Sequence, residues 1–424
     1  MKHIEIKGLF NRFNYSFDFG GQEIQMLTGP NGFGKSTILR CIKAFSDSDL
    51  RYFFTLPFQS IRIGNSEIKE EVLIEKNAQK QLLINGEYIT EKIMLEYKSP
   101  YPRNGVDGRI DYMVKIWDES EQNTSDLGQL GKSDYKKILI TMKDIVGDVF
   151  FIEEQRLIQR KQNEKNSFYF DAKGMFRTEK NSGDWESIIE LIPGKIKGYL
   201  DTVAGEYANK ANSLDATYPQ RLFDDSDDSF SEEEYKRQRE LMNEKLDKLK
   251  KYEISQFGKM EAQYKAKYEK ALKIYFEDFN EKYKTYEQLI EKLDMFTDMV
   301  NKRIYFDEIR IDKDKGCVVV DKENEKDVLD LNKLSSGEKE IIVLFYKLIF
   351  EVKEGTMLLL DEPEISLHVA WQRMFAEDMY TIAKKRGIRI LAATHAPMII
   401  NGHRDVQIDL GELYGRACKR LNQA

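Results

Sequence analysis

The sequence has little cysteine and no long apolar run, and these two shortages exclude several classes of protein. Its three cysteines, Cys41, Cys317 and Cys418, lie far apart and have neither disulfide nor metal-ligand spacing. We therefore expect a reduced, cytoplasmic protein. No apolar run reaches the length of a membrane span, and the opening residues MKHIEIKGLF alternate like a strand rather than a signal peptide. Neither a membrane partner nor export is expected.

The charge balance also lacks a basic excess. The formal net charge is −7 over 424 residues, of which 33% are charged and 41% hydrophobic. This composition predicts a solvated exterior around enough core for two or three domains. It does not indicate a uniformly basic nucleic-acid surface, but a local basic groove, and hence nucleic acid as a partner, stays open.

Patterns at both ends of the chain predict one head domain built from two separate segments. Near the start, an apolar strand, a glycine-rich turn and a helix over 23–45 precede short alternating runs over 60–115, which predict an antiparallel meander. Near the other end, strands alternate with helices, which predicts a parallel sheet. The expected helices there are 336–352 and 367–386, and the expected strands are 356–360 and 388–392.

The middle of the chain predicts helical arms. Residues 231–300 contain no proline, and their apolar residues recur at three- and four-residue steps, as in a coiled coil, a helical hairpin or a bundle. The acidic stretch 212–234 is expected to be a linker, and 303–321 a hairpin that turns at Lys315 and Gly316. The expected domains are 1–210 (first part of the head), 211–302 (linker and helical insertion) and 303–424 (second part of the head).

The stretch Gly29–Thr37, GPNGFGKST, has the pattern of a phosphate-binding loop between an apolar strand and a helix. Its glycines let backbone N–H groups converge on phosphate oxygens, and the helix N-terminus adds its positive dipole end. Lys35 is expected to reach the outer phosphates, and the Ser36 hydroxyl to bind Mg²⁺. The alternative is a glycine-rich turn that matches by chance.

A second chemical motif is TMLLLDEPEISLH, in which two carboxylates follow a buried strand. Asp361 is expected to hold Mg²⁺ through water, and Glu362 to orient the attacking water or accept its proton. The alternative is that these acids merely lead into the next helix through the Asp-Glu-Pro sequence.

Two further motifs complete the candidate site. The loop Leu334–Glu338, LSSGE, offers hydroxyl and N–H groups at a helix start, which suits an anion, although a helix cap with Glu338 as partner explains it as well. This loop opens a helix far from the phosphate loop in sequence, so it could complete the site of a neighbouring subunit. His395 follows a strand and could sense the γ-phosphate or position water, whereas a structural histidine is the alternative.

The phosphate loop, LSSGE, LLLDEPE, SLH and a late histidine, in this order, resemble the heads of ABC-type ATPases, including the SMC-type repair proteins. The fold that this resemblance implies is α/β, a P-loop head with a mixed sheet, an antiparallel subdomain and an inserted helical arm. It implies ATP and Mg²⁺ as cofactors, Glu362 as catalytic carboxylate and His395 as switch histidine. Ser366–His368 would be the loop that crosses the dimer seam.

The resemblance also implies the remaining site residues. Those that would bind nucleotide are Asn31, Gly32, Gly34, Lys35, Ser36, Thr37, Ser335, Ser336 and Gly337. Those that would hold the metal are Ser36, Asp361 and Gln155, with Gln159 and Gln162 as nearby alternatives to the last. Ser336 departs from the commoner S-G-G signature. The nucleotide would be enclosed between two copies that pair head-to-tail about a two-fold axis.

A narrower resemblance covers SLHVAWQRMFAEDMY and ATHAPMIINGHRDVQIDLGEL, which are similar to defence ATPases of the overcoming-lysogenization-defect (OLD) type, and most to the AriA-type ATPase subunits of PARIS anti-phage systems. That family implies a propeller-like homo-oligomer of dimers, with a hexamer among its sizes, that restrains a TOPRIM nuclease until a viral anti-restriction protein is sensed. The chain ends soon after His395 and shows no acidic nuclease constellation, so we expect the nuclease in a partner.

Two other functions compete with this interpretation. An SMC-like ATPase for DNA repair or DNA tethering would have the same head, but about seventy helical residues folded as a hairpin reach only about 50 Å, which is short for such arms. The ATP-binding subunit of a transporter is disfavoured by the helical insertion. Salt-sensitive binding to duplex DNA would favour the repair function.

Overall fold

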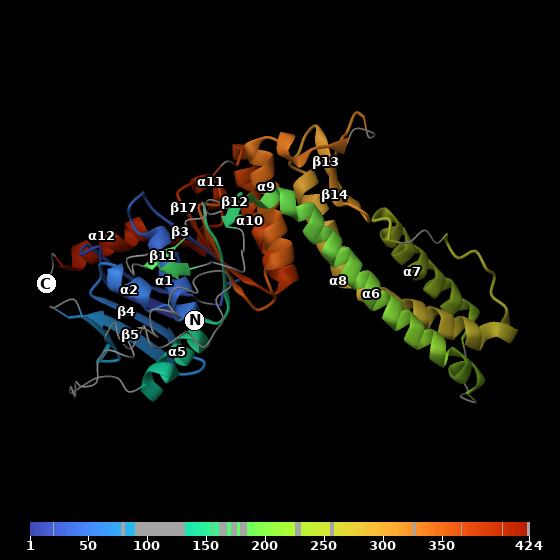
Figure 1. Cartoon of the computed structure of the whole chain (residues 1–424), viewed down its shortest axis with the longest axis horizontal. Helices are drawn as coiled ribbons and strands as arrows, with labels where there is room; N and C mark the ends of the chain where they lie inside the picture. Colours follow the sequence, from blue (N-terminus) through green and yellow to red (C-terminus); the bar gives the residue numbers. More distant parts are fainter. Residues whose placement is uncertain are drawn as a thin grey trace. The chain divides into compact units, whose positions relative to one another are not determined.

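The chain folds into two compact units. The computed structural model describes residues 1–19, 21–77, 81–89, 132–154, 156–160, 168–170, 176–178, 185–224, 230–254, 258–324, 328–365, 367–400 and 402–421. The first unit comprises Met1–Arg156, Arg160–Trp185 and Val352–Ala424, and the second comprises Leu157–Gln159 and Glu186–Glu351 (Figure 1). The first unit is thus discontinuous in sequence, with the second inserted into it.

A five-stranded parallel sheet forms the centre of the first unit. Its strands are β3 (Ile24–Thr28), β8 (Val149–Ile152), β16 (Met357–Asp361), β17 (Arg389–Thr394) and β18 (Gln407–Asp409), in the order β18-β3-β17-β16-β8. All residues of β3 and β16 are buried, as expected for parallel strands covered on both faces. The parallel sheet predicted from the alternating patterns is confirmed.

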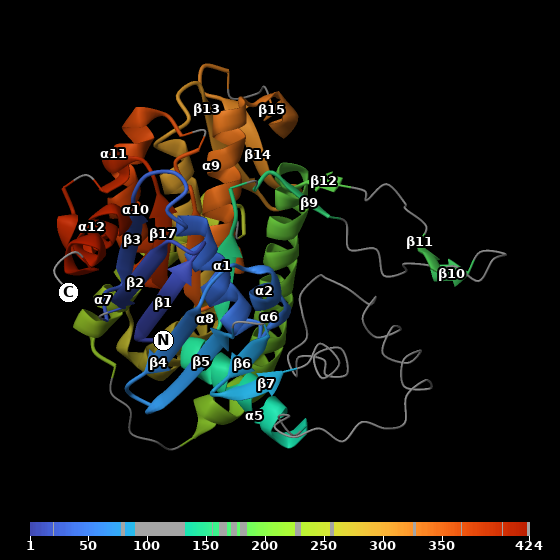
Figure 2. The same ribbon diagram turned by 90° about the vertical axis from the view of Figure 1, so that its left-hand side faces the viewer.

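A six-stranded antiparallel sheet lies in the same unit, with the order β2-β1-β4-β5-β6-β7 (Figure 2). Its strands are β1 (His3–Leu9), β2 (Phe13–Asp18), β4 (Ser60–Asn65), β5 (Glu70–Lys76), β6 (Leu82–Ile84) and β7 (Glu87–Ile89). The predicted meander over 60–115 is confirmed up to β7, and the rest of it, 90–115, lies outside the described residues. The first unit therefore has the α/β class and the antiparallel subdomain that the sequence predicts.

Helices surround the two sheets and join their cores. They are α1 (Lys35–Ser46), α2 (Arg51–Thr55), α5 (Lys132–Val146), α10 (Val369–Arg386), α11 (Pro397–Ile400), α12 (Leu410–Leu421) and the short η4 (Arg404–Val406). One hydrophobic cluster contains Ile6 of β1, Ile38 of α1 and Leu359 of β16, so both sheets share a core through α1. The short strands β10 (Phe168–Phe170) and β11 (Phe176–Thr178) pair with each other.

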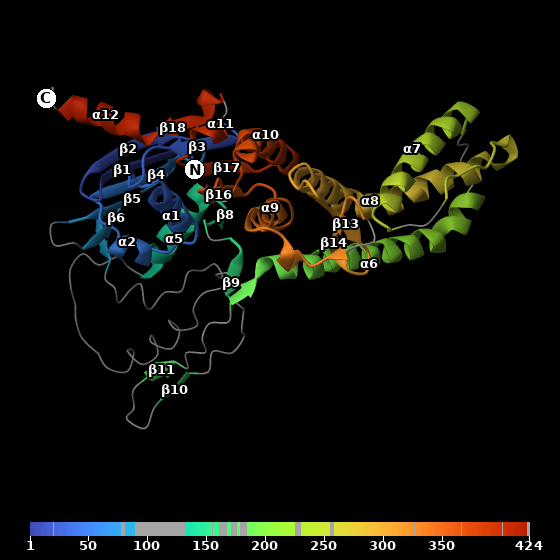
Figure 3. The same ribbon diagram turned by 90° about the horizontal axis from the view of Figure 1, so that it is seen from above.

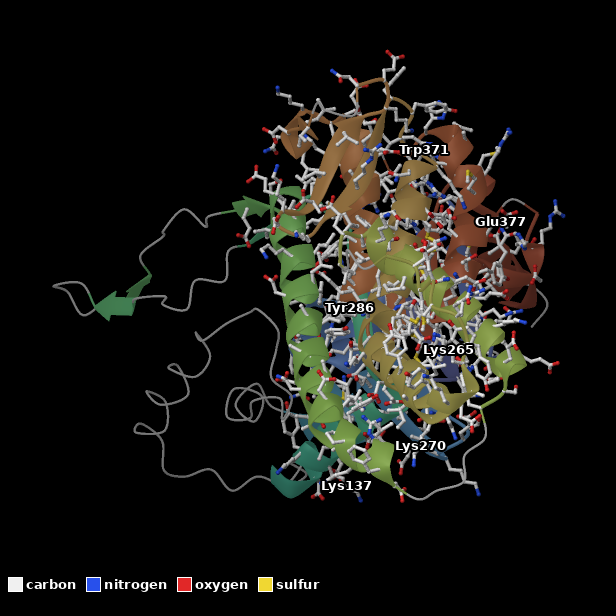
Figure 4. The ribbon with its side chains drawn as sticks, turned by 90° about the vertical axis from the view of Figure 1, so that its right-hand side faces the viewer. Lys137, Lys265, Lys270, Tyr286, Trp371 and Glu377 are labelled. Atoms are coloured by element: carbon white, nitrogen blue, oxygen red, sulfur yellow. The ribbon has the colours of Figure 1, made fainter. Side chains whose placement is uncertain are left out.

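Three helices dominate the second unit, namely α6 (Ile188–Phe223), α7 (Glu232–Lys251) and α8 (Glu269–Asn301) (Figure 3). The rings of Tyr207 on α6 and Tyr286 on α8 lie 5.4 Å apart, and Tyr286 is labelled in Figure 4. Lys245 of α7 donates a hydrogen bond to Asn280 of α8 at 2.7 Å. Helix α8 therefore pairs with α6 as well as with α7.

This arrangement corrects two predictions for the middle of the chain. Within the predicted linker 212–234, residues 212–223 are helical because α6 continues through Phe223, and residues 232–234 belong to α7, which begins at Glu232. Residues 258–265 do not continue the predicted long helix, since α8 begins only at Glu269 after the short η1 (Ala266–Tyr268). The inserted unit starts near residue 186 and extends to 351, whereas the expected insertion was 211–302.

The rest of the second unit is a small sheet and a capped helix. β13 (Asp307–Asp312), β14 (Gly316–Asp321) and β15 (Val328–Leu329) are antiparallel, which confirms the hairpin turning at Gly316. A Cβ at Gly316 would lie 1.9 Å from the Pro193 carbonyl oxygen of α6, so only glycine fits there. After η2 (Leu331–Lys333), α9 (Ser336–Tyr346) continues as the π-helical η3 (Lys347–Glu351). Strands β9 (Ile158–Arg160) and β12 (Trp185–Ser187) lie where the chain passes between units.

Within the described residues, no helix combines the length and apolar character that a membrane crossing requires.

The pairing of α6 with α8 gives a testable prediction. Arg221 of α6 donates two hydrogen bonds to the carboxylate of Asp278 on α8, at 2.5 and 2.9 Å, and Asp278 is only 7% exposed. We expect Asp278→Ala to lower the local unfolding free energy of α8 by about 1–3 kcal/mol, because it leaves the guanidinium without this partner. Hydrogen exchange of the α8 amides measures this change.

Asp201→Ala is the matched control, since Asp201 pairs with Lys197 on the exposed face of α6 and its side chain is 61% exposed. It should change the same free energy by about 0.5 kcal/mol or less. Equal effects of the two variants would contradict the pairing.

Candidate functional site

The candidate site lies where three adjacent parallel strands of the first unit end. Thr28, the last residue of β3, is paired with Thr394, the last of β17, and Ala393 is paired with Asp361, the last of β16. Because parallel strands place their carboxyl ends at one edge, the phosphate loop, the Asp361–Glu362 pair and His395 all begin at this edge. These are the segments that the sequence singled out.

The phosphate loop connects β3 to α1 and leaves the helix N-terminus open. Gly34, the N-cap of α1, has φ +86° and provides no side-chain cap, so the first-turn N–H groups have no such partner. Gly32 has φ +82°, and a Cβ there would meet nothing within 4 Å. This combination of open N–H groups and open space fits a phosphate.

The other predicted residues of this loop differ in burial. Asn31 is exposed, whereas Ser36 and Thr37 are half-buried on the first turn of α1. Lys35 is 5% exposed, and its ammonium group donates hydrogen bonds to the carbonyl oxygens of Gly29 at 2.9 Å and Pro30 at 3.3 Å. Its charge thus lies inside the loop, where a phosphate could share it.

Ser36 and Asp361 meet although 325 residues separate them, because the Ser36 hydroxyl donates a 2.8 Å hydrogen bond to Oδ1 of Asp361. Burial raises the pKa of the Asp361 carboxyl, while the bond from Ser36 and the charge of Arg40 oppose that increase. A hydroxyl and a carboxylate oxygen are hard ligands that suit Mg²⁺, which commonly keeps water and phosphate oxygens as its other ligands. The pair therefore fits the predicted metal site.

Glu362 has an unusual backbone conformation for a residue with a side chain. Its φ is +44°, and its N–H donates a 2.9 Å hydrogen bond to the Ala393 carbonyl of β17. The left-handed region costs about 1–2 kcal/mol for such a residue, and strain of this kind clusters at functional sites. This conformation turns the chain sharply where β16 ends.

His395 lies between two carboxylates. Its Nδ1 atom is 3.5 Å from Oε2 of Glu362 and 3.2 Å from Oε1 of Glu364, and its side chain is 46% exposed. The structure therefore brings the two predicted catalytic residues, Glu362 and His395, next to each other. The third acid of DEPE, Glu364, was not among the predicted site residues.

Sequence reasoning also missed Phe10. It lies in the turn between β1 and β2 with φ +53°, is 41% exposed, and its ring is 3.6 Å from where a Cβ on Gly34 would lie. Its exposed ring beside the phosphate loop could pack against a nucleotide base. No pattern in the sequence distinguishes Phe10 from the buried aromatic residues of the neighbouring strands.

The LSSGE loop belongs to the second unit and forms a complete capping box. The Ser335 hydroxyl and N–H both donate to Oε2 of Glu338, at 2.7 and 2.9 Å, and the Glu338 N–H donates back to Ser335 Oγ at 3.4 Å. Ser335 and Ser336 are exposed, and Gly337 is half-buried. The capping interpretation is thus observed, and both donors of Ser335 are bonded to the Glu338 carboxylate.

Two predicted site residues lie outside the described residues. They are Gln155, a predicted metal ligand, and Ser366, the first residue of the predicted seam loop. Within the same loop, His368 is described, and its Nδ1 accepts a 3.3 Å hydrogen bond from the Ala370 N–H at the start of α10. Among the described residues, no cluster of three or more His, Cys, Asp or Glu side chains could hold a metal.

The buried carboxyl of Asp361 generates a prediction about stability and pH. A folded-state pKa above the ordinary value of about 3.9 means that ionisation of Asp361 opposes folding as pH rises through that raised pKa. We expect Asp361→Asn to raise the melting temperature of the nucleotide-free protein at neutral pH by about 2–4 °C. Below about pH 4 this advantage should vanish. Thermal unfolding across pH measures it.

Asp148→Asn is the opposite-sign control, because a hydrogen bond from Lys143 lowers the pKa of the Asp148 carboxyl. This variant should not gain stability at neutral pH. A destabilised Asp361→Asn protein at neutral pH would contradict the burial argument.

Comparisons with known proteins place this site in a family. The family model described as AAA ATPase domain matches residues 1–400. Among solved structures, the chain is similar to an Smc head domain with an extended coiled coil, bound to the C-terminal domain of ScpA, from Pyrococcus furiosus. That similarity has 16% identity, covers 94% of this chain and 90% of that chain, and has a TM-score of 0.37.

Two further structures are similar at the same level. An Smc head bound to the C-winged helix domain of ScpA has 13% identity, covers 94% of this chain and 91% of that chain, and has a TM-score of 0.39. An SMC head domain from Thermotoga maritima has 13% identity, coverage of 94% and 90%, and a TM-score of 0.34. No curated protein shows significant similarity. Because the family match extends over residues 1–400, the chain belongs to the AAA ATPase domain family.

Proposed function

We propose that the protein binds and hydrolyses ATP at the edge of the parallel sheet. The observation that carries this proposal is the hydrogen bond between Ser36 and Asp361, next to Glu362 and His395. These groups come from β16, β17 and the start of α1, and an uncapped helix N-terminus lies among them. Hydroxyl, carboxylate and open N–H groups at one sheet edge are what a magnesium-nucleotide complex requires.

Each residue has a distinct role in this proposal. The N–H groups of 32–37 bind phosphate oxygens, and Lys35 transfers part of its hydrogen bonding from the loop carbonyls to the outer phosphates. Ser36 and Asp361 hold Mg²⁺, and Gln155, which follows β8 in sequence, is the proposed third ligand. Bound Mg²⁺ supplies positive charge that offsets the charge of the phosphate oxygens. Phe10 packs against the base.

Glu362 and His395 perform the chemical step. The Glu362 carboxylate orients a water and accepts its proton, and this role is compatible with a side chain that is 21% exposed at the site. His395 presents the ring nitrogen opposite Nδ1 to the γ-phosphate and donates to it as the imidazolium, in which both ring nitrogens carry protons. The contact between His395 and the γ-phosphate therefore exists only before hydrolysis, and His395 can distinguish bound ATP from bound ADP.

We further propose that two copies share each nucleotide. The loop that contains Ser335, Ser336 and Gly337 is exposed at the N-terminus of α9, which favours an anion, and it belongs to a different unit from the phosphate loop. In a head-to-tail pair, this loop contacts the γ-phosphate held by the other copy, and the loop of 366–368 lies at the seam. ATP then favours the closed pair, and hydrolysis releases it.

A mixing experiment tests the shared site. Lys35→Ala removes phosphate binding, and Ser335→Arg places a bulky side chain where the second copy's nucleotide would lie, so each variant alone should be inactive. A one-to-one mixture forms mixed pairs with one intact site each. Random pairing makes about half of all pairs mixed, and each mixed pair has one intact site out of two. The mixture should therefore recover about one quarter of wild-type turnover. Steady-state phosphate release measures this recovery.

The control is each variant mixed with itself at the same total concentration. Absence of recovery in the cross-mixture, with both variants folded and Ser335→Arg still binding ATP, would show that nucleotide is not shared in this way.

The biological role that we propose is that of a scaffold and sensor in an anti-phage defence complex. It is supported by the resemblance of 366–380 and 393–413 to the OLD and AriA-type defence ATPases, and the family assignment supports the ATPase part of the role. In this role a cytoplasmic homo-oligomer, up to a hexamer, restrains a TOPRIM-type nuclease in the ATP-bound state. A viral anti-restriction protein then triggers its release.

Co-purification tests this role. Glu362→Gln should slow hydrolysis by about 10²-fold or more while keeping ATP bound, so it should retain the proposed nuclease subunit when the two are expressed together. Lys35→Ala should lose that partner, because it cannot bind the nucleotide. Native mass measurement of the two complexes gives the composition. Retention that does not depend on Lys35, or no nuclease with either variant, would contradict the proposed restraint.

A further inference from the structure

Glu364 is a buried carboxylate that the roles above do not use. Its side chain is 4% exposed. Its Oε1 atom accepts hydrogen bonds from the Thr394 hydroxyl at 2.6 Å and from the N–H groups of His395 at 2.9 Å and Ala396 at 3.2 Å. All three donors lie at or just beyond the end of β17. One oxygen atom therefore holds the backbone that carries His395.

The same oxygen also faces the His395 ring. Oε1 of Glu364 is 3.2 Å from Nδ1, which is closer than the 3.5 Å between Nδ1 and Oε2 of Glu362. With Nδ1 turned toward carboxylates, Nε2 is the nitrogen left for another partner. A carboxylate that accepts from one ring N–H of a histidine fixes the ring orientation, and its negative charge favours the imidazolium form, which can donate from the other nitrogen as well.

The charge of Glu364 needs an explanation beyond backbone bonding. A neutral glutamine could accept the same three hydrogen bonds through its carbonyl oxygen. Among the described residues, Oε2 of Glu364 is buried and has no hydrogen-bond partner, an arrangement that costs about 1–3 kcal/mol. A costly buried group of this kind points to a functional requirement.

The turn that carries Glu364 is itself fixed by Arg156. This residue is 1% exposed, and its Nη2 donates 3.0 Å hydrogen bonds to the carbonyl oxygens of Pro363 and Ile365, on either side of Glu364. Arg156 follows Gln155, the proposed metal ligand, directly in sequence. A chain of hydrogen bonds thus connects the segment after β8 with the end of β17.

We propose that Glu364 is a positioning residue, whose carboxylate orients His395 so that Nε2 faces the terminal phosphate of the nucleotide. The inference rests on the proposed ATPase function and deepens it. Glu362 remains the carboxylate that serves the water, while Glu364 acts only through the histidine. The two glutamates of the DEPE sequence therefore have separate tasks, although both lie near Nδ1 of the same imidazole.

A double-mutant cycle tests this role. Glu364→Gln keeps the shape and the three hydrogen bonds, so we expect an unchanged melting temperature and KM but a kcat reduced by about tenfold. In a His395→Ala background, the same substitution should have no further effect on kcat, because the residue through which it acts is gone. A merely structural role would lower kcat by equal factors in both backgrounds.

Two further variants keep the test decisive. Thr394→Val removes one donor to Oε1 and should lower kcat by a smaller factor, again only when His395 is present. Asp278→Asn, which neutralises a buried carboxylate in the other unit, is the control and should leave kcat within about twofold. No ATP turnover by the wild-type protein would refute the proposed function itself. Wild-type turnover combined with an unaffected Glu364→Gln variant, or with additive effects, would overturn the positioning role alone.

Discussion

The contact between Ser36 and Asp361 is the constraint on which the rest of the site depends. It joins the first turn of α1 to the end of β16, two places far apart in sequence, and it exists because β3, β17 and β16 are adjacent and parallel. If any of these strands shifted in register, the hydroxyl and the carboxylate would separate. The antiparallel sheet supports this geometry from the other side of α1 through the shared core.

Much of this architecture could be predicted because short sequence patterns indicate its strands, turns and helices. The glycines of 29–34, the apolar run before Asp361 and the alternation of strands and helices each indicate structure within a few residues. Helix α6 could not be predicted in this way. Its second half is polar and contains Pro219, and it is helical where it packs against α8 through side chains such as Tyr207 and Arg221. Tertiary contact overrides weak local preference there.

The sequence indicates which segments meet at the edge of the parallel sheet, but not how their residues are arranged there. That Glu362 adopts a left-handed conformation, and that Glu364 holds the end of β17, follow from backbone geometry that spacing does not encode. Phe10 is a similar case, since a turn places it beside the loop of Gly34. The left-handed backbone of Glu362 and the unpaired Oε2 of Glu364 oppose stability, as does the buried carboxyl of Asp361. A protein retains such features where function requires them.

The order of strands also has a consequence for how the chain folds as it is made. β3 emerges early, yet both of its neighbours in the sheet, β17 and β18, come from the last part of the chain. Until the ribosome has released those segments, the strand before the phosphate loop has two unpaired edges and buried-type side chains. Strand pairings between segments so distant in sequence form slowly, and the intermediates that precede them are prone to aggregate. A chaperone would therefore matter most while the amino-terminal segment has been made and the strands that pair with β3 have not.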